Sequence, residues 1–492
     1  MGKLPFLVIA YIFILLFAIV LFVVVAKFTK RRALKNFLLI AILAVVFVTL
    51  IIPFVSLIRS SYLKPVYIDA VSDNSGGTIV SLWRNGVIYL RRLGSDGKTI
   101  WTKQIGHGSY RISFHKVSSN NSGGVVLFWG ESQSQGLSPY FLYAQSIDAN
   151  GNCLWGENDV LISSQAVYNV PYNILNNGLG GAFFSWIVVK DGYEIRIQRV
   201  DALGNVLWGK DGKQIASSKN RIGDLNLVSN LNGVVAVWTV EQENNSHIYV
   251  QILDLDGNNL LQSGGLRIDT NSWYCRNVYA LSDNSGGAII VFQEGYEDPA
   301  PIYVVRIDSQ GKQIVEKVKI ASGDPSYIRV TPQKDGFILG WIVSPGTIPL
   351  FPSQWTLHIQ KFSYLFTALW DEKVVYVSEG TEGRLDFNLG TSDGYDLFVV
   401  WQRVASPTKG GLLYAQKLNS EGKELWGSSG TLISSYNLLF YPSSPHVMPD
   451  GAGGMIVISL MKNFWGTKYI IFFQKFSSSG NPLWGKEAIQ GF

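Results

Sequence analysis

The stretch Asp73-Asn-Ser-Gly-Gly77-Thr-Ile-Val-Ser-Leu-Trp83 decides the fold, because it is one copy of a unit that recurs along the chain. Each copy has a turn, usually rich in glycine, followed by a short apolar run that often ends in tryptophan. The other seven apolar runs are 125–129, 182–186, 234–238, 288–292, 337–341, 397–401 and 455–459. The last turn residues of successive copies are 47 to 60 residues apart. A repeat of this length is typical of propellers and solenoids.

A second part of the unit follows each apolar run. It begins with an alternating segment such as Tyr143-Ala-Gln-Ser-Ile-Asp148 and continues with a turn glycine four residues before a tryptophan. The glycine–tryptophan pairs are Gly97/Trp101, Gly151/Trp155, Gly204/Trp208, Gly422/Trp426 and Gly480/Trp484. The three remaining copies have Leu260-Leu261, Val315 and Leu369-Trp370 at the corresponding places. Apolar β-branched runs predict buried strands, alternation predicts half-buried strands, and the glycine dipeptides predict tight hairpins.

Four antiparallel strands in each of eight copies predict an all-β fold, an eight-bladed β-propeller. A linear solenoid is the alternative, but it would need capping repeats, and the first and last copies look like ordinary members. In a propeller, the paired tryptophans and glycines named above would dock one blade against the next, since an indole fills the space between neighbouring sheets.

The motif Gly422-Lys-Glu-Leu-Trp426 resembles the tryptophan-docking motif of quinoprotein-type eight-bladed propellers, which also place a turn glycine four residues before a tryptophan. The resemblance covers residues 60–492 as a repeat pattern and implies docking between blades. It implies no cofactor, because the chain has no adjacent cysteine pair. The sialidase-type box has its glycine three residues before the tryptophan, and Ser95-Asp96-Gly97 does not match it.

The chain begins with two long apolar segments. Residues 4–26 and 37–58 contain no charge, and each is long enough to cross a bilayer as a helix. The loop 27–35 between them holds five basic residues, namely Lys27, Lys30, Arg31, Arg32 and Lys35. Short basic loops stay cytoplasmic. We therefore expect a transmembrane α-helical hairpin in residues 1–59, a linker at 60–65, and a propeller at 66–492 that lies, like both termini, on the extracytoplasmic side of the cell membrane.

Charge and residue types exclude several functions. Residues 1–59 hold seven basic residues and no acid, so the rest of the chain keeps 34 basic residues against 36 acidic ones, which argues against nucleic-acid binding. The five histidines are scattered without metal-ligand spacing. Cys153 and Cys275 lie in distant copies, which predicts core thiols rather than a disulfide. We expect no catalytic, cofactor or metal site from the sequence. The sequons at Asn120 and Asn244 would be accessible outside the cell.

One face of a propeller should carry the function. The glycine turns are short and similar, whereas the connections after the apolar runs differ in length and composition, and variable loops on a rigid scaffold commonly bind partners. Two of these loops are apolar, and they supply candidate contacts with a partner or the membrane: Ile348, Leu350, Phe351, Trp355, Phe464 and Trp465. The sequence thus predicts a membrane-anchored binding or scaffold subunit of a cell-envelope protein assembly. The alternatives are a propeller enzyme, either a hydrolase or a quinoprotein-type oxidoreductase, and a glycan-binding propeller.

Overall fold

The structure is a computed structural model, and its described residues form part of one unit, Val66–Phe492. The described ranges are 67–84, 86–106, 111–132, 141–165, 172–230, 232–243, 245–268, 274–295, 299–323, 327–343, 355–377, 385–392, 395–406, 410–428, 430–435, 440–442, 445–463, 469–484 and 489–490.

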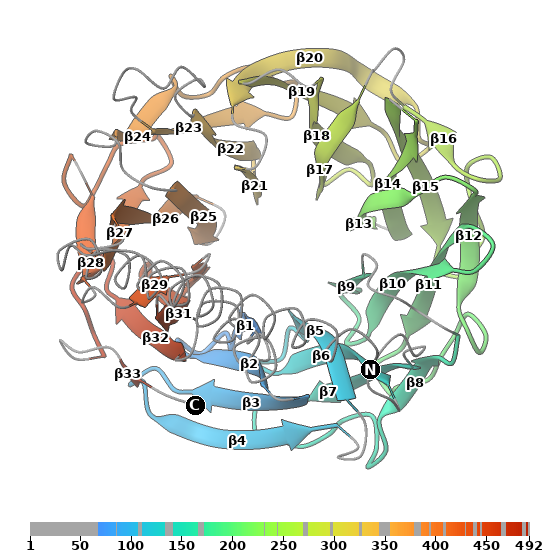
Figure 1. The fold of residues 1–492 in the computed structure, drawn as a ribbon, viewed down its shortest axis with the longest axis horizontal. Helices are drawn as coiled ribbons and strands as arrows, with labels where there is room; N and C mark the ends of the chain where they lie inside the picture. The colour runs from blue at the N-terminus through green and yellow to red at the C-terminus, as the bar shows by residue number, and fades with distance from the viewer. Residues whose placement is uncertain are drawn as a thin grey trace, which may run out of the picture. The chain divides into compact units, whose positions relative to one another are not determined.

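The first four copies of the repeat fold as four blades, each an antiparallel sheet in chain order (Figure 1). Their strands are β1 (Tyr67–Ser72), β2 (Thr78–Arg84), β3 (Val87–Leu93) and β4 (Thr99–Ile105) in blade 1; β5 (Arg111–Ser119), β6 (Val125–Ser132), β7 (Phe141–Ile147) and β8 (Val160–Ser163) in blade 2; β9 (Tyr172–Asn176), β10 (Ala182–Val189), β11 (Tyr193–Val200) and β12 (Lys213–Ser218) in blade 3; and β13 (Ile222–Asn230), β14 (Gly233–Gln242), β15 (Asn245–Asp254) and β16 (Leu266–Arg267) in blade 4.

The last four copies form blades of the same design. Their strands are β17 (Cys275–Ser282), β18 (Ala288–Glu294), β19 (Ala300–Ile307) and β20 (Gln313–Gly323) in blade 5; β21 (Ile328–Gln333), β22 (Gly336–Val343), β23 (Thr356–Ser363) and β24 (Lys373–Val377) in blade 6; β25 (Leu385–Ser392), β26 (Asp396–Ser406), β27 (Gly410–Leu418) and β28 (Thr431–Ser435) in blade 7; and β29 (Phe440–Pro442), β30 (His446–Pro449), β31 (Met455–Asn463), β32 (Tyr469–Phe476) and β33 (Ile489–Gln490) in blade 8, where β29 and β30 both pair with β31.

The blades form a closed ring. The first strands of the blades lie nearest the centre of the ring (Figure 1). Each of them, or β30 in blade 8, contacts the innermost strands of both neighbouring blades, so that β1 lies between β5 and β30. Val80 and Leu82 of blade 1 pack in one buried cluster with Ile456 and Phe473 of blade 8. The all-β eight-bladed propeller is therefore confirmed, and the closed ring excludes the linear solenoid.

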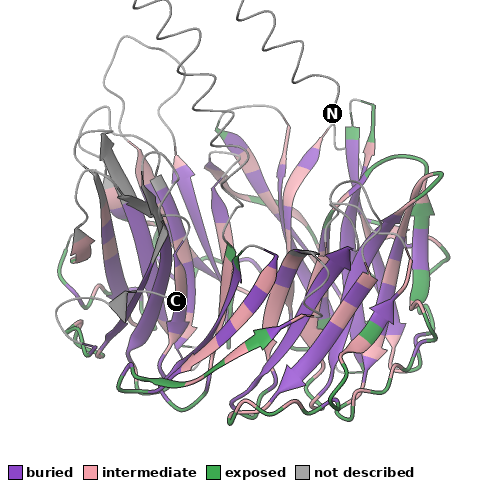
Figure 2. Cartoon of the chain, turned by 60° about the horizontal axis from the view of Figure 1, so that its bottom comes forward, coloured by how far each residue is buried: buried purple, intermediate pink, exposed green. Residues whose placement is uncertain are grey.

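The core lies between blades rather than within one sheet. The second strand of a blade is covered on both faces, as β6 shows with eight buried residues in succession. Figure 2 shows that buried residues dominate the inner strands of the blades. Each apolar cluster draws side chains from two adjacent blades; Phe128 of blade 2, for example, shares a cluster with Phe184 of blade 3. This is why the second strands read as continuous apolar runs instead of alternating ones.

The two ends of the strands define two faces. The turn face carries the β1–β2 and β3–β4 connections of every blade, and the loop face carries the β2–β3 connections and the passages between blades. On the loop face, the link from Arg84 to Val87 is far shorter than the link from Val343 to Thr356. Tyr67 pairs with Trp83 at the end of β1 remote from the turn, so the chain enters the propeller at the loop face.

The expected transmembrane hairpin lies outside the described residues, as do the basic loop and the linker. In the part of the chain that is described, no helix has the length and apolar character needed to span a bilayer.

Candidate functional site

Six tryptophans lie at the joints between blades. Each donates its indole Nε1–H to a backbone oxygen in a turn of the next blade, two residues before the residue at the turn-glycine position. The pairs are Trp101–Ala149 at 2.8 Å, Trp155–Ala202 at 3.2 Å, Trp208–Leu255 at 3.1 Å, Trp370–Ser420 at 2.8 Å, Trp426–Ser478 at 3.0 Å and Trp484–Ser95 at 2.9 Å. The last pair joins blade 8 to blade 1.

The turn glycines allow this close approach. Gly422 has a φ of +77°, and a Cβ added to it would lie 2.7 Å from Cδ2 of Trp370. Gly151, Gly204 and Gly480 lie in the same way against Trp101, Trp155 and Trp426, and Gly97 shares the positive φ. Glycine adopts a positive φ without steric cost, and it has no side chain that would collide with the indole.

Trp370 was missing from the five glycine–tryptophan pairs because its turn lacks glycine. Phe366 takes that place with a φ of +65°, which is unusual for a bulky residue. Its ring is buried and packs edge-on against Phe337, which offsets part of the backbone strain. The spacing of four residues to Trp370 was the signal in the sequence. In blade 4, Leu261 stands where the tryptophan would be and lies against Gly311.

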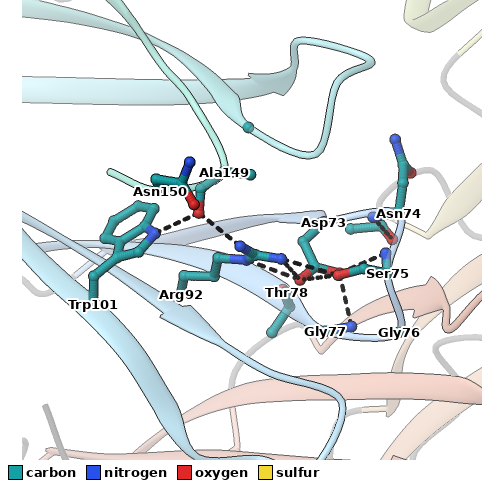
Figure 3. Close-up of polar contacts among 12 residues, drawn as sticks. Asp73, Asn74, Ser75, Gly76, Gly77, Thr78, Arg92, Trp101, Ala149 and Asn150 are labelled. Atoms are coloured by element: carbon teal, nitrogen blue, oxygen red, sulfur yellow. Dashed lines mark hydrogen bonds and ion pairs between the residues drawn. The ribbon is translucent and has the colours of Figure 1, made fainter. Parts of the chain in front are cut away.

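Cationic side chains reinforce the same joints. Arg92 Nε and Nη2 donate to Asp73 Oδ2 at 3.0 and 2.9 Å, and its Nη1 donates to Ala149 O of blade 2 at 2.6 Å (Figure 3). Ala149 O thus accepts bonds from both Arg92 and Trp101 (Figure 3). Other blades also have a basic residue at the strand position of Arg92, and it contacts its own turn, the next blade or both. These residues are Arg199, Arg306, Lys361, Lys417 and Lys475.

A ring of polar side chains surrounds the propeller axis, and no shared sequence motif marks its residues. One residue on each innermost strand, seven or eight positions before the last turn residue, is polar; the eight residues are Asp69, Lys116, Asn173, Asn226, Tyr279, Arg329, Asn388 and His446. We call these residues the axial belt. The regular distance to the turn was the signal, but their chemical types differ from copy to copy.

The axial belt links each innermost strand to the next. Lys116 Nζ donates to Asn173 Oδ1 at 2.8 Å, and Asn173 Nδ2 donates to Leu225 O. The further contacts are Asn226 Nδ2 to Val278 O at 2.9 Å, Tyr279 OH to Ile328 O at 3.0 Å, Arg329 Nη2 with Asp386 Oδ1 at 3.6 Å, Asn388 Nδ2 to Pro445 O at 2.9 Å, His446 Nδ1 with Asp69 Oδ1 at 4.0 Å, and Asp69 Oδ2, which accepts from Val117 N at 3.0 Å. These side chains hold the ring together at its centre.

Two histidines that are far apart in the sequence belong to this region. His115 is buried, and its Nε2 lies 2.9 Å from Ser81 Oγ, whose hydroxyl donates to Asp69 O at 3.1 Å. Burial lowers the pKa of His115 to about 4; the Asp69 carboxylate opposes this shift and His446 adds to it. Burial also lowers the pKa of the neighbouring Lys116. His115 is therefore neutral at pH 7.

Asp224 is a carboxyl on β13 whose pKa is raised. It adopts a φ of +44° at a bulge in the strand and keeps solvent-exposed surface, while partial desolvation by the surrounding protein raises its pKa and Glu241 acts in the same direction. The backbone N–H of Val278 in blade 5 lies 3.5 Å from Asp224 Oδ2 and opposes the shift. A carboxyl that binds a proton more readily than usual can act as a general acid.

Of the six apolar loop candidates, the structure describes only Trp355. Its ring packs edge-on against Tyr327 at 6.2 Å and is partly buried against the apolar cluster of blades 6 and 7. This end of its loop therefore lies on the propeller body. Ile348, Leu350, Phe351, Phe464 and Trp465 lie outside the described residues.

The potential metal ligands, the two cysteines and the two sequons are the remaining residues that the sequence singles out. Among the described residues, no three His, Cys, Asp or Glu side chains gather as metal ligands. Cys275 is buried as expected, but Cys153 is partly exposed because it lies in the hairpin of blade 2; neither forms a disulfide. Asn120 is buried, with its Oδ1 accepting from Ser122 N and Gly124 N, so this sequon is not accessible in the folded turn. Asn244 is outside the described residues.

No model of a known protein family matches the sequence, and neither does any curated protein. Solved structures do resemble it. A polysaccharide lyase described as an ulvan lyase is 11% identical over 66% of this chain and 89% of its own, with a TM-score of 0.40. Prolyl oligopeptidase B from Galerina marginata is 10% identical over 85% of this chain and 56% of its own, with a TM-score of 0.44. An endo-arabinase from Bacteroides thetaiotaomicron is 11% identical over 50% of this chain and 94% of its own, with a TM-score of 0.28. At these identities the likeness extends to the fold alone.

Proposed function

We propose that the protein is a membrane-anchored, extracytoplasmic β-propeller that serves as a binding or scaffold subunit of a protein assembly in the cell envelope. The apolar runs 4–26 and 37–58 and the basic loop between them support the anchor and its orientation. The strands of all eight blades lie from Tyr67 onward, and we assign the residues before them to the anchor.

The observation that supports the binding role best is the contrast between the two faces. On the turn face, the same short hydrogen-bonded turn recurs; Asp73 Oδ1, for example, accepts from Gly77 N at 2.7 Å as Asp283 Oδ1 does from Gly287 N at 2.8 Å. On the loop face, the connections vary widely in length. A rigid ring that presents unlike loops on one rim is suited to recognising an irregular protein surface.

The partner would meet the loop face, where Tyr67 begins the propeller. The candidate contacts are the apolar residues Phe351, Phe464 and Trp465, with Ile348 and Leu350 beside them. Because the chain enters the ring at this face, the same loops would stand near the membrane or a membrane-embedded partner.

A pull-down of the full chain in mild detergent, followed by mass spectrometry, tests the binding role. A variant with Phe351→Ser, Phe464→Ser and Trp465→Ser should lose the co-purified partner. The control Leu203→Ser changes a side chain that is 77% exposed on the turn face and should keep it. Equal recovery of the partner with both variants would refute the role of the loop face.

The side of the membrane is tested separately. In a Cys153→Ser background, Leu203→Cys places an accessible thiol on the turn face, while the remaining native thiol, Cys275, is buried. A maleimide that cannot cross membranes should label this thiol in intact cells. Labelling only after lysis would place the propeller in the cytoplasm and contradict the proposal.

A hydrolase is the second candidate, and Asp224 is the observation that favours it, because its pKa is raised on an innermost strand. Asp224→Asn should then abolish any hydrolytic activity that the intact protein shows against glycoside or peptide substrates. The quinoprotein-type oxidoreductase would be revealed by the absorbance of a bound quinone in the purified protein.

The glycan-binding alternative predicts exposed aromatic side chains at equivalent positions in several blades. Among the described residues, Tyr67 and Tyr395 are the exposed tyrosines, and they occupy unrelated positions. The exposed side chains that do recur, one per blade immediately before the docking position, are aliphatic: Ile100, Leu154, Leu207, Leu260, Ile314, Leu369, Leu425 and Leu483. This repetition favours a protein partner over a sugar.

A further inference from the structure

We call the joint between blades 8 and 1 the seam. It brings together the last and the first blade, so these two neighbours in the ring are not consecutive in the sequence. It is held by non-covalent contacts alone. Lys475 Nζ donates to Gly76 O at 2.8 Å and Trp484 Nε1 to Ser95 O at 2.9 Å, and at the axis His446 lies 4.0 Å from Asp69.

Asp69 connects three blades. Its carboxylate accepts from Val117 N of blade 2 and faces His446 of blade 8, and its backbone oxygen accepts the Ser81 hydroxyl of blade 1. Ser81 in turn contacts His115 of blade 2. The position of β1 therefore depends on a short polar chain that runs from His446 through Asp69 and Ser81 to His115.

The single hydroxyl hydrogen of Ser81 determines which ring nitrogen of His115 carries a proton. The Ser81 hydroxyl has one hydrogen, and it is donated to Asp69 O, so Ser81 Oγ can only accept from His115 Nε2–H. The other ring nitrogen, Nδ1, is then a bare acceptor. It is buried and has no hydrogen-bond partner among the described residues. A second proton would create a buried N–H without an acceptor together with a buried charge, and both are costly.

We propose that His115 is a proton-sensitive latch: when it takes up a proton, β1 loosens from blades 2 and 8, and the ring opens at the seam. The groups facing this histidine set the response. On β1, the Asp69 carboxylate favours the proton, as does the backbone of Ser81 on β2, and on β30 a protonated His446 opposes it. Tyr172 on β9 stays neutral, since burial raises its pKa.

The size of the effect follows from linkage. Opening lets His115 return from a pKa of about 4 to its ordinary value of 6.5, so acidification to about pH 5 should increase the population of the open seam about thirtyfold. Below about pH 4 the gain levels off, because the closed ring is protonated too.

Hydrogen exchange of the full chain in detergent, corrected for the intrinsic pH dependence, measures this opening. Amides of β1 and β30 should exchange about thirtyfold faster at about pH 5 than at neutral pH, and those of β13, across the ring, should change less than about twofold. In His115→Gln, which keeps a neutral N–H donor toward Ser81, the acceleration at β1 should vanish. The control His247→Gln changes another buried histidine, in blade 4, and should retain it.

A uniform acceleration in all blades, or an unchanged acid response in His115→Gln, would overturn the latch. A second variant protects the test against misfolding. His446→Gln changes a partly exposed residue and removes a repelling cation, so the open seam should require a lower pH than in the wild type. An unshifted response in this variant would count against the charge coupling on which the latch depends.

Discussion

Trp484 donates its indole N–H to the backbone oxygen of Ser95, 389 residues earlier in the chain, at 2.9 Å. The same bond joins blades that are adjacent in sequence, as Trp426 and Ser478 show at 3.0 Å. The ring is therefore closed by a copy of the contact found at five of its other joints, and among the described strands none is exchanged between its two ends.

Replacing Trp484 by phenylalanine should weaken this closure. The variant loses the indole N–H and part of a side chain that is 6% exposed, and we expect the free energy of unfolding to fall by about 2 kcal/mol. Trp426→Phe is the matched control, because Trp426 has the same exposure at a joint that the chain itself connects. Denaturant unfolding should show similar losses for both, whereas local exchange at the seam should rise only in Trp484→Phe.

Gly422→Ala and Gly427→Ala should differ although both glycines lie in blade 7 with positive φ, +77° and +85°. A Cβ at Gly422 would meet Trp370 at 2.7 Å, and one at Gly427 has nothing within 4 Å. We expect a loss of about 3 kcal/mol for Gly422→Ala, from strain and the clash, and about 1 kcal/mol for Gly427→Ala, from strain alone. Equal losses in thermal unfolding would show that the indole yields freely.

Leu261→Trp should stabilise the joint between blades 4 and 5. Gly311 already has the positive φ of a docking turn, +76°, and lies against Leu261. An indole at this position could donate to Ser309 O, as Trp101 donates to Ala149 O. We expect a gain of about 1 kcal/mol in denaturant unfolding. Leu260→Trp, at a position that is 53% exposed, should leave stability unchanged and is the control.

Asp73→Asn should destabilise blade 1, because it leaves the largely buried guanidinium of Arg92 without its carboxylate. We expect a loss of about 3 kcal/mol at pH 7. Burial alone would raise the pKa of Asp73, but hydrogen bonds from Ser75, Arg92 and Gly77 outweigh it and lower the pKa.

The sign of the pH dependence follows from this lowered pKa. The wild type has the full stabilisation above the unfolded-state pKa of about 3.9 and loses it as the pH falls toward the folded-state value. The difference in the free energy of unfolding between the wild type and Asp73→Asn should therefore become smaller in acid. The pKa of the exposed Asp96 is also lowered, by hydrogen bonds to Lys98, but solvent screens this pair, so Asp96→Asn should show a much smaller narrowing at the same ionic strength.

His115 should govern stability in a higher pH range. Its pKa is about 4 in the folded protein and about 6.5 in the unfolded chain, so the unfolded chain binds the proton more readily. Stability should be complete above about pH 6.5 and decline by about 3 kcal/mol as the pH falls to about 4. The free energy of unfolding of His115→Gln, measured in urea, should lack this decline; a slope equal to that of the wild type would refute the assignment.

The repeat pattern alone determined the architecture. Glycine turns such as Asn121-Ser-Gly-Gly124 and apolar runs such as 125–129 depend on local conformation and on burial of both faces, and these requirements recur in every blade. The position of Trp370 could also be predicted from its spacing, although the phenylalanine in its turn concealed the pair. These requirements of turn conformation and burial can be recognised in a single copy, because each copy must satisfy them by itself.

Only the tertiary structure brought Asp69, His115 and His446 together, because ring closure places the first and last innermost strands side by side. The axial belt was equally hidden. Asparagine, lysine, arginine, tyrosine, histidine and aspartate can each bond to a neighbouring blade, so the position tolerates many residue types and shows no shared letter in the sequence. Turn and core positions restrict the residue through its own backbone and volume, whereas a joint requires only that some partner lies within reach across the ring.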